Sequence, residues 1–113
     1  MYFCNFGSGS KGNSTFIKAG KSSILIDQGF SGKEGEKRMQ SKDIDPKNIR
    51  AILVTHEHSD HTKGAGILAR RYDIPVFITP KTEQALDEDF FKKVDLHNFN
   101  SGDNFTIGDI NVK

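Results

Sequence analysis

Short apolar runs, each bounded by glycine, proline or charged residues, divide the chain into segments of strand length. Residues 2–6 and 14–19 (STFIKA) contain the aromatic and β-branched side chains that favour strands. Residues 23–27 and 51–54 (AILV) are built around continuous apolar runs, the pattern of strands buried on both faces. With a turn at Gly20-Lys21, the first third is predicted to form antiparallel sheet. Further strands are predicted at 75–78, 105–107 and 110–112, the last two joined by a Gly108-Asp109 turn that favours a type II′ hairpin.

Helical spacing appears between these runs. Ala65, Leu68, Ala69 and Tyr72 fall at i, i+3, i+4 and i+7, which predicts one face of an amphipathic helix. Ser31 and Glu34 have the spacing of a capping box. The predicted helices therefore cover about 32–42, the segment from Ala65, and 81–89 after Pro80, with a short helical turn at Asp45-Pro46.

The composition is that of one globular domain: 113 residues, 35% apolar, with nine phenylalanines and a net charge of +1. The charge is unevenly distributed. Residues 11–50 carry nine Lys or Arg against five Asp or Glu, whereas residues 51–113 carry seven against ten. This bias fits either an ordinary solvated surface or a basic strip that serves a polyanionic substrate.

The single cysteine, Cys4, has no partner for an internal disulfide, which favours a reducing compartment and predicts a cytoplasmic protein. Nowhere do apolar residues continue long enough to span a bilayer, so we expect no membrane partner.

A glycine-rich stretch, residues 7–14 (GSGSKGNS), has nearly the spacing of a phosphate-binding loop. Asn13 stands where that motif needs lysine, and a strand-like segment follows where the motif needs a helix. The sequence therefore predicts a glycine-rich turn between two strands and not a nucleotide site.

The candidate chemistry lies in residues 55–64, THEHSDHTKG, where His56, His58, Asp60 and His61 fall within six positions. Imidazole and carboxylate groups are ligands of divalent metals of the zinc and manganese type. The helical zinc motif H-E-x-x-H does not fit, because Asp60 occupies its second histidine position. The apolar run before the cluster and the helix after it place these residues on a strand-to-helix loop, with two adjacent metals implied.

These residues carry a resemblance. THEHSDHTKG, preceded by AILV, resembles the T-H-x-H-x-D-H signature of the metallo-β-lactamase fold superfamily. Upstream, GSGSKGNSTFIKAGKSSILIDQGFSGK is similar to the N-terminus of the WalJ (YycJ) branch. The resemblance implies an α/β (α+β) fold: the N-terminal half of an αββα sandwich, with a mixed sheet and flanking helices.

Carried over by position, the resemblance implies that His56 and His58 bind a first metal and that Asp60 and His61 bind a second. Asp60 would also be the catalytic residue that positions the nucleophile and takes up its proton. Asp27 would support the metal loop without binding metal. Glu57 occupies a variable position, and His97 matches no motif and is expected to be a surface or core histidine.

The implied activity is hydrolysis by a metal-bound hydroxide with two divalent ions, Zn²⁺ or Mn²⁺, on DNA or another phosphodiester, as in a 5′ to 3′ exonuclease. A thioester or lactone hydrolase shares every residue named above and stays open as an alternative. A non-catalytic, metal-binding and self-associating fragment is a further alternative.

The resemblance also predicts incompleteness. Complete members add a third histidine for the first metal, a bridging aspartate and a final histidine, all downstream of the segment that corresponds to FTIGDINVK. We therefore expect residues 1–113 to be a partial domain that binds metal weakly or partially and is catalytically incomplete. Half a sandwich is also expected to expose an apolar sheet face, through which the chain could self-associate.

Overall fold

The computed structural model describes residues 2–7, 13–30, 32–55, 64–86, 90–100, 104–107 and 110–112. Its strands are β1 (Tyr2–Gly7), β2 (Ser14–Ala19), β3 (Ser22–Ile26), β4 (Ala51–Val54), β5 (Val76–Ile78), β6 (Leu96–Asn98), β7 (Phe105–Ile107) and β8 (Ile110–Val112). Its helices are α1 (Gly32–Gln40), the 3₁₀ turn η1 (Pro46–Asn48), α3 (Ala65–Tyr72) and α4 (Pro80–Ala85).

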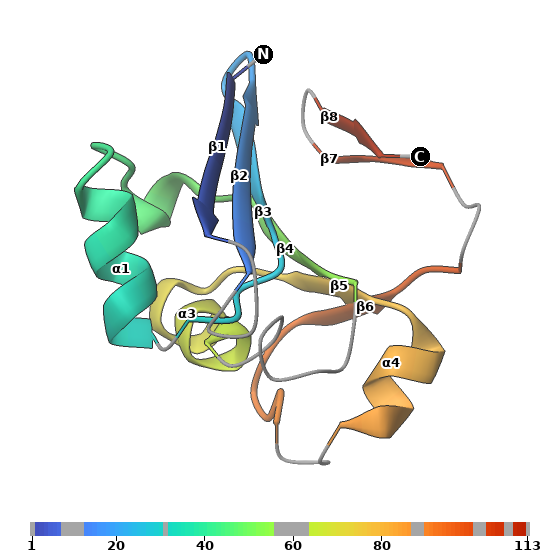
Figure 1. Ribbon diagram of the computed structural model, residues 1–113. Helices are drawn as coiled ribbons and strands as arrows, with labels where there is room; N and C mark the ends of the chain where they lie inside the picture. Colours follow the sequence, from blue (N-terminus) through green and yellow to red (C-terminus); the bar gives the residue numbers. More distant parts are fainter. Residues whose placement is uncertain are drawn as a thin grey trace.

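Six strands form one mixed sheet in the order β1-β2-β3-β4-β5-β6 (Figure 1). The first three strands are antiparallel, as predicted, and the tight turn between β2 and β3 uses Gly20 at φ 60°. From β3 onward neighbouring strands are parallel, with Ile26 opposite Leu53 and Val54 opposite Ile78. The carboxyl ends of β3 to β6 therefore all meet at one edge of the sheet, which is where loops of parallel sheets carry binding groups.

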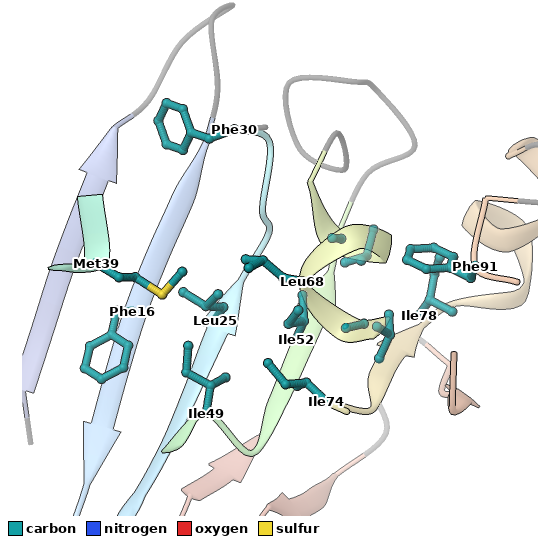
Figure 2. Packing of buried hydrophobic residues seen from close by; sticks show 14 residues of the cluster. Phe16, Leu25, Phe30, Met39, Ile49, Ile52, Leu68, Ile74, Ile78 and Phe91 are labelled. Carbon is teal, nitrogen blue, oxygen red and sulfur yellow. The ribbon is translucent and has the colours of Figure 1, made fainter. Parts of the chain in front are cut away.

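The two faces of the sheet bury separate clusters, because successive side chains of a strand point to opposite faces. On one face Leu25, Ile52 and Val54 pack with Met39 of α1 and Leu68 of α3. Figure 2 shows this cluster extending from Phe16 and Ile49 to Ile78 and Phe91. Both helices cover this face, which accounts for every second apolar residue of β3 and β4.

The opposite face buries Ile24, Ala51 and Leu53 against Ile107 and Ile110 of the β7–β8 hairpin. Figure 1 shows the hairpin on the side of the sheet away from α1 and α3, so the hairpin forms a layer on the second face of the sheet. Among the described residues the one large apolar side chain that is exposed is Ile67 of α3, at 41%. The apolar face expected to lie open is thus partly covered by the chain itself.

Several boundaries differ from the sequence-based prediction. Helix α1 ends at Gln40 and not at 42, and α4 is shorter than predicted, since Leu86 already has extended backbone angles. The edge strand β6 was not predicted, because only its first residue, Leu96, is apolar, and the polar His97 and Asn98 that follow are exposed. The prediction for Ser31 and that for the Gly108-Asp109 turn lie outside the described residues.

No helix in the described part of the chain is both long and apolar enough to cross a membrane. Cys4 is half-buried and packs against the cluster under α1 and α3, so it acts as a small packing residue.

Candidate metal centre

Asp27 and Thr55 meet where the parallel strands β3 and β4 end. The Thr55 main-chain N–H donates to Oδ1 of Asp27 at 2.8 Å, and its hydroxyl lies 2.7 Å from Oδ2 and 2.9 Å from Oδ1. Asp27 is 6% exposed, and its own N–H donates to the carbonyl of Leu53 at 2.7 Å. These donors provide hydrogen bonds for both oxygens of the buried carboxylate. The contact fixes Thr55, the residue before His56, to the end of β3.

The backbone of Asp27 departs from β geometry, at φ 64°. Aspartate tolerates this left-handed region better than most residues, yet the conformation has a cost that the surrounding contacts must offset. The turn directs the chain out of β3 and brings the Asp27 carboxylate to Thr55.

The other end of the histidine segment is held by the residue next to Asp27. The N–H of Gly64 donates to the carbonyl of Gln28 at 2.9 Å, and Gly64 is the N-terminal cap of α3. The consecutive residues Asp27 and Gln28 therefore bind both residues that flank positions 56–63. One short turn after β3 thus sets where this segment leaves the sheet and where it enters α3.

The glycine-rich segment ends at the same place. Gly29 donates its N–H to the carbonyl of Asn13 at 2.9 Å, which joins the residue before β2 to the turn after β3. The sequence predicts a glycine-rich turn in this segment. Of that turn the structure describes Gly7, and residues 8–12 lie outside the described residues. Three chain segments therefore converge at the carboxyl edge of β3 and β4.

Gln28 packs against helix α1 with unusual closeness. It is 1% exposed, and its Nε2 has no hydrogen-bond partner among the described residues. A Cβ placed on Gly35 of α1 would lie 1.9 Å from this nitrogen. The absence of a side chain at Gly35 therefore leaves space for the Gln28 amide. The turn after β3, which holds both ends of the histidine segment, packs directly against α1.

Helices α1 and α3 are joined by a polar cluster on the outer side. Arg71 donates a short, charge-assisted hydrogen bond to Glu36, and the Tyr72 hydroxyl donates to the same oxygen at 2.9 Å. The Arg71 hydrogen bond lowers the pKa of Glu36, and acceptance by Glu36 raises the pKa of Tyr72.

The four predicted ligands, His56, His58, Asp60 and His61, lie outside the described residues, as does Glu57. Within the described part, no three or more His, Cys, Asp or Glu side chains gather in a way that could hold a metal ion. The chemistry of the donor set, three imidazoles and a carboxylate, fits a zinc-type cation, and the residues that flank the set are both anchored. The fourth histidine, His97, is exposed on β6, stacks on Phe77 with ring centroids 4.9 Å apart and lies 3.1 Å from Asp95.

Sequence reasoning assigned no role to Thr55 or Gln28. Thr55 is part of the T-H-x-H-x-D-H pattern, and a hydroxyl directly after a buried strand is a signal that could have been used. Gln28 offers no such signal, because its main-chain carbonyl makes the contact and any residue type has one.

Comparison with known proteins agrees with this geometry. Residues 7–111 match the family described as the Metallo-beta-lactamase superfamily, and the chain belongs to it. Members of this superfamily are metal-dependent, typically with zinc. The chain is 39% identical over 122 residues to exodeoxyribonuclease YycJ of Bacillus anthracis, covering all of this chain and 44% of the relative. It is 40% identical over 110 residues to exodeoxyribonuclease WalJ of Streptococcus pneumoniae, covering 94% of this chain and 41% of the relative.

Among solved structures, a subclass B3 metallo-beta-lactamase from a soil metagenome library, MEM-A1, superposes with a TM-score of 0.75 at 19% identity. The match covers 96% of this chain and 47% of that protein, and it establishes the shared fold. The chain spans less than half the length of the curated relatives named above.

Proposed function

We propose that the chain is the N-terminal part of a metal-dependent hydrolase that cleaves phosphodiester bonds of DNA, as a 5′ to 3′ exonuclease. The observation that carries the metal site is the anchoring of both flanks of residues 56–63 by Asp27 and Gln28. The substrate class is supported by the names of the two relatives at 39% and 40% identity, both exodeoxyribonucleases.

In this proposal His56 and His58 hold one cation, and Asp60 and His61 hold a second. When bound, Zn²⁺ or Mn²⁺ would supply Lewis acidity, which acidifies water and polarises a phosphoryl oxygen. Asp60 accepts the proton of the attacking water, and Asp27 supports the loop by holding Thr55 while binding no metal itself. In the chain by itself, these four ligands leave coordination positions open, so we expect weak or partial occupancy and little hydrolysis.

Metal binding by the 113-residue chain tests the ligand assignment. Calorimetric titration with Zn²⁺ should show binding that His58→Ala weakens strongly and His97→Ala leaves unchanged. His97 is the matched control, because it is a histidine exposed on β6 and lies outside the loop. Equal affinities of the two variants would remove the assigned role of His58.

Substrate class is tested in a complete protein. We suggest replacing the corresponding N-terminal region of the Streptococcus pneumoniae relative, 40% identical over 110 residues, with this chain. The chimera should release nucleotides from the 5′ end of labelled duplex DNA, and chimeric His58→Ala should not. Hydrolysis of a thioester or lactone without cleavage of DNA would contradict the proposed substrate and favour the small-molecule alternative.

For the chain on its own we propose self-association through the sheet face that carries the β7–β8 hairpin. Ile17, Ile26 and Phe77 are only partly buried on that face, beside the part covered by Ile107 and Ile110. Light scattering should give a mass above 12.6 kDa that falls in the variant Ile17→Lys/Phe77→Lys. A wild-type monomer at high protein concentration would refute this proposal.

A further inference from the structure

A large hollow formed by described residues lies at the other end of the sheet, away from the candidate metal centre. Its volume is about 920 Å³. Its walls are the turn between β2 and β3 and the segment from the end of α1 to the start of β4. Gly20 and Lys21 precede β3, and Asp27 follows it. At about 3.3 Å for each step along the strand, the six steps from Lys21 to Asp27 separate the two places by about 20 Å.

The hollow is strongly cationic. Five basic side chains line it, namely Lys18, Lys21, Lys42, Lys47 and Arg50. Two carboxylates share the lining, Asp43 and Asp45, and Asp45 already accepts the N–H of Lys47 at 3.0 Å as the cap of η1. This concentration accounts for the basic bias of residues 11–50, because side chains far apart in sequence gather here.

The walls that carry these charges are built on fixed main-chain contacts. The Ser23 hydroxyl donates to the carbonyl of Asn48 at 2.9 Å, and the N–H of Arg50 donates to the carbonyl of Ser23 at 2.8 Å. At the end of α1, the N–H of Lys42 donates to Met39 at 3.0 Å. The lining also includes Phe16 and Ile49, which are buried in the core below. The main chain that carries these charges is therefore fixed by short turns, so ligand binding has to order the lysine and arginine side chains but not the backbone.

We propose that this hollow binds the phosphate backbone of a DNA strand, as an anchoring site separate from the metal loop. Several cations with few compensating carboxylates attract a polyanion without reading its sequence, because each neutralised phosphate releases condensed counterions. The choice of DNA among polyanions rests on the proposed function. The site holds the substrate at a distance from the reacting bond, which favours a long strand over a short one.

The test measures binding without cleavage. Fluorescence anisotropy of a labelled single-stranded oligodeoxynucleotide is followed in EDTA, with the 113-residue chain and its variants. Lys47→Glu/Arg50→Glu should weaken binding by at least about twentyfold at 0.1 M salt, and the slope of log K against log salt should fall by about 1.4, for two lost phosphate contacts. A second variant, Lys18→Gln/Lys42→Gln, changes the opposite walls and should act in the same direction.

The matched control is Lys92→Glu/Lys93→Glu, which makes the same change in net charge on exposed lysines of the segment before β6. Equal weakening by the control and the hollow variants would overturn the proposal, since net charge alone would explain it. Inorganic phosphate competing as well as the oligonucleotide, at equal phosphate concentration, would also overturn it and assign a small-anion site. Because no metal is present, retained binding with no nuclease activity in the chimera would refute the proposed function and leave this site standing.

Discussion

The carboxylate of Asp27 holds Thr55 through both its oxygens, with the Thr55 N–H 2.8 Å from Oδ1 and the Thr55 hydroxyl 2.7 Å from Oδ2. Asp27 directly follows the strand β3, and Thr55, 28 residues later, directly follows the parallel strand β4. The histidine segment begins at the following residue, so this contact fixes the point from which the first candidate ligand, His56, follows.

Replacing Asp27 by asparagine should destabilise the fold and weaken metal binding. The amide keeps the shape but loses the charge and turns N–H groups toward the donors of Thr55, a loss of about 1.5–3 kcal/mol in the free energy of unfolding. We expect Zn²⁺ affinity to fall on the order of tenfold, measured by calorimetry beside urea denaturation. Asp73→Asn is the control, because Asp73 is also an aspartate at positive φ, 55°, but is exposed at the end of α3. Similar losses in both variants would contradict the role of Asp27.

The Thr55 hydroxyl can be tested separately from the Thr55 main chain. Thr55→Val retains the N–H bond to Asp27 and the branched shape but removes the hydroxyl, and should cost about 1 kcal/mol in urea denaturation. Thr55→Ser restores the donor and should recover most of the stability. Equal free energies of unfolding for Thr55→Ser and Thr55→Val would show that the hydroxyl contact does not stabilise the fold.

Gly35→Ala should disturb the turn after β3 by steric conflict. The new Cβ would lie 1.9 Å from the buried Gln28 Nε2, so the amide or the helix must shift. We expect a loss of about 1–3 kcal/mol in the free energy of unfolding, with part of it recovered in Gly35→Ala/Gln28→Ala. Gly32→Ala is the helix control, because its Cβ would meet Cγ2 of Ile67 at 2.7 Å and not Gln28, so Gln28→Ala should recover no stability in that background. Additive effects of the two changes at 28 and 35 would refute the direct conflict.

The link between α1 and α3 should depend on pH through Glu36. Arg71 lowers the pKa of Glu36 below its ordinary 4.5, so the folded state holds the ionised carboxylate more strongly than the unfolded state does. This contribution is fully present above pH 4.5 and is lost as the pH falls through the lowered pKa. Wild type should therefore have a higher Tm than Glu36→Gln at pH 7, with the difference closing in acid. A difference that does not change with pH would exclude the ion pair as its source.

The pattern of apolar runs was sufficient to predict most of the fold. Strands β2 and β4 have the predicted bounds, because their apolar residues are buried on the faces that the runs require. Strand β6 was not predicted because it is an edge strand held by main-chain hydrogen bonds to β5. Such hydrogen bonds do not depend on the type of side chain, so the sequence gives no signal for them.

By itself the sequence determined the family of the chain and the identity of its candidate ligands, because T-H-x-H-x-D-H concentrates metal-binding side chains within one local segment. Only the tertiary structure decided what surrounds that segment. Asp27 reaches Thr55 and Gln28 reaches Gly64 because β3 and β4 lie side by side in parallel, a pairing between residues far apart in the chain. For the same reason, the lysines near positions 20 and 45 look like scattered surface charge in the sequence and form one cationic hollow in the fold.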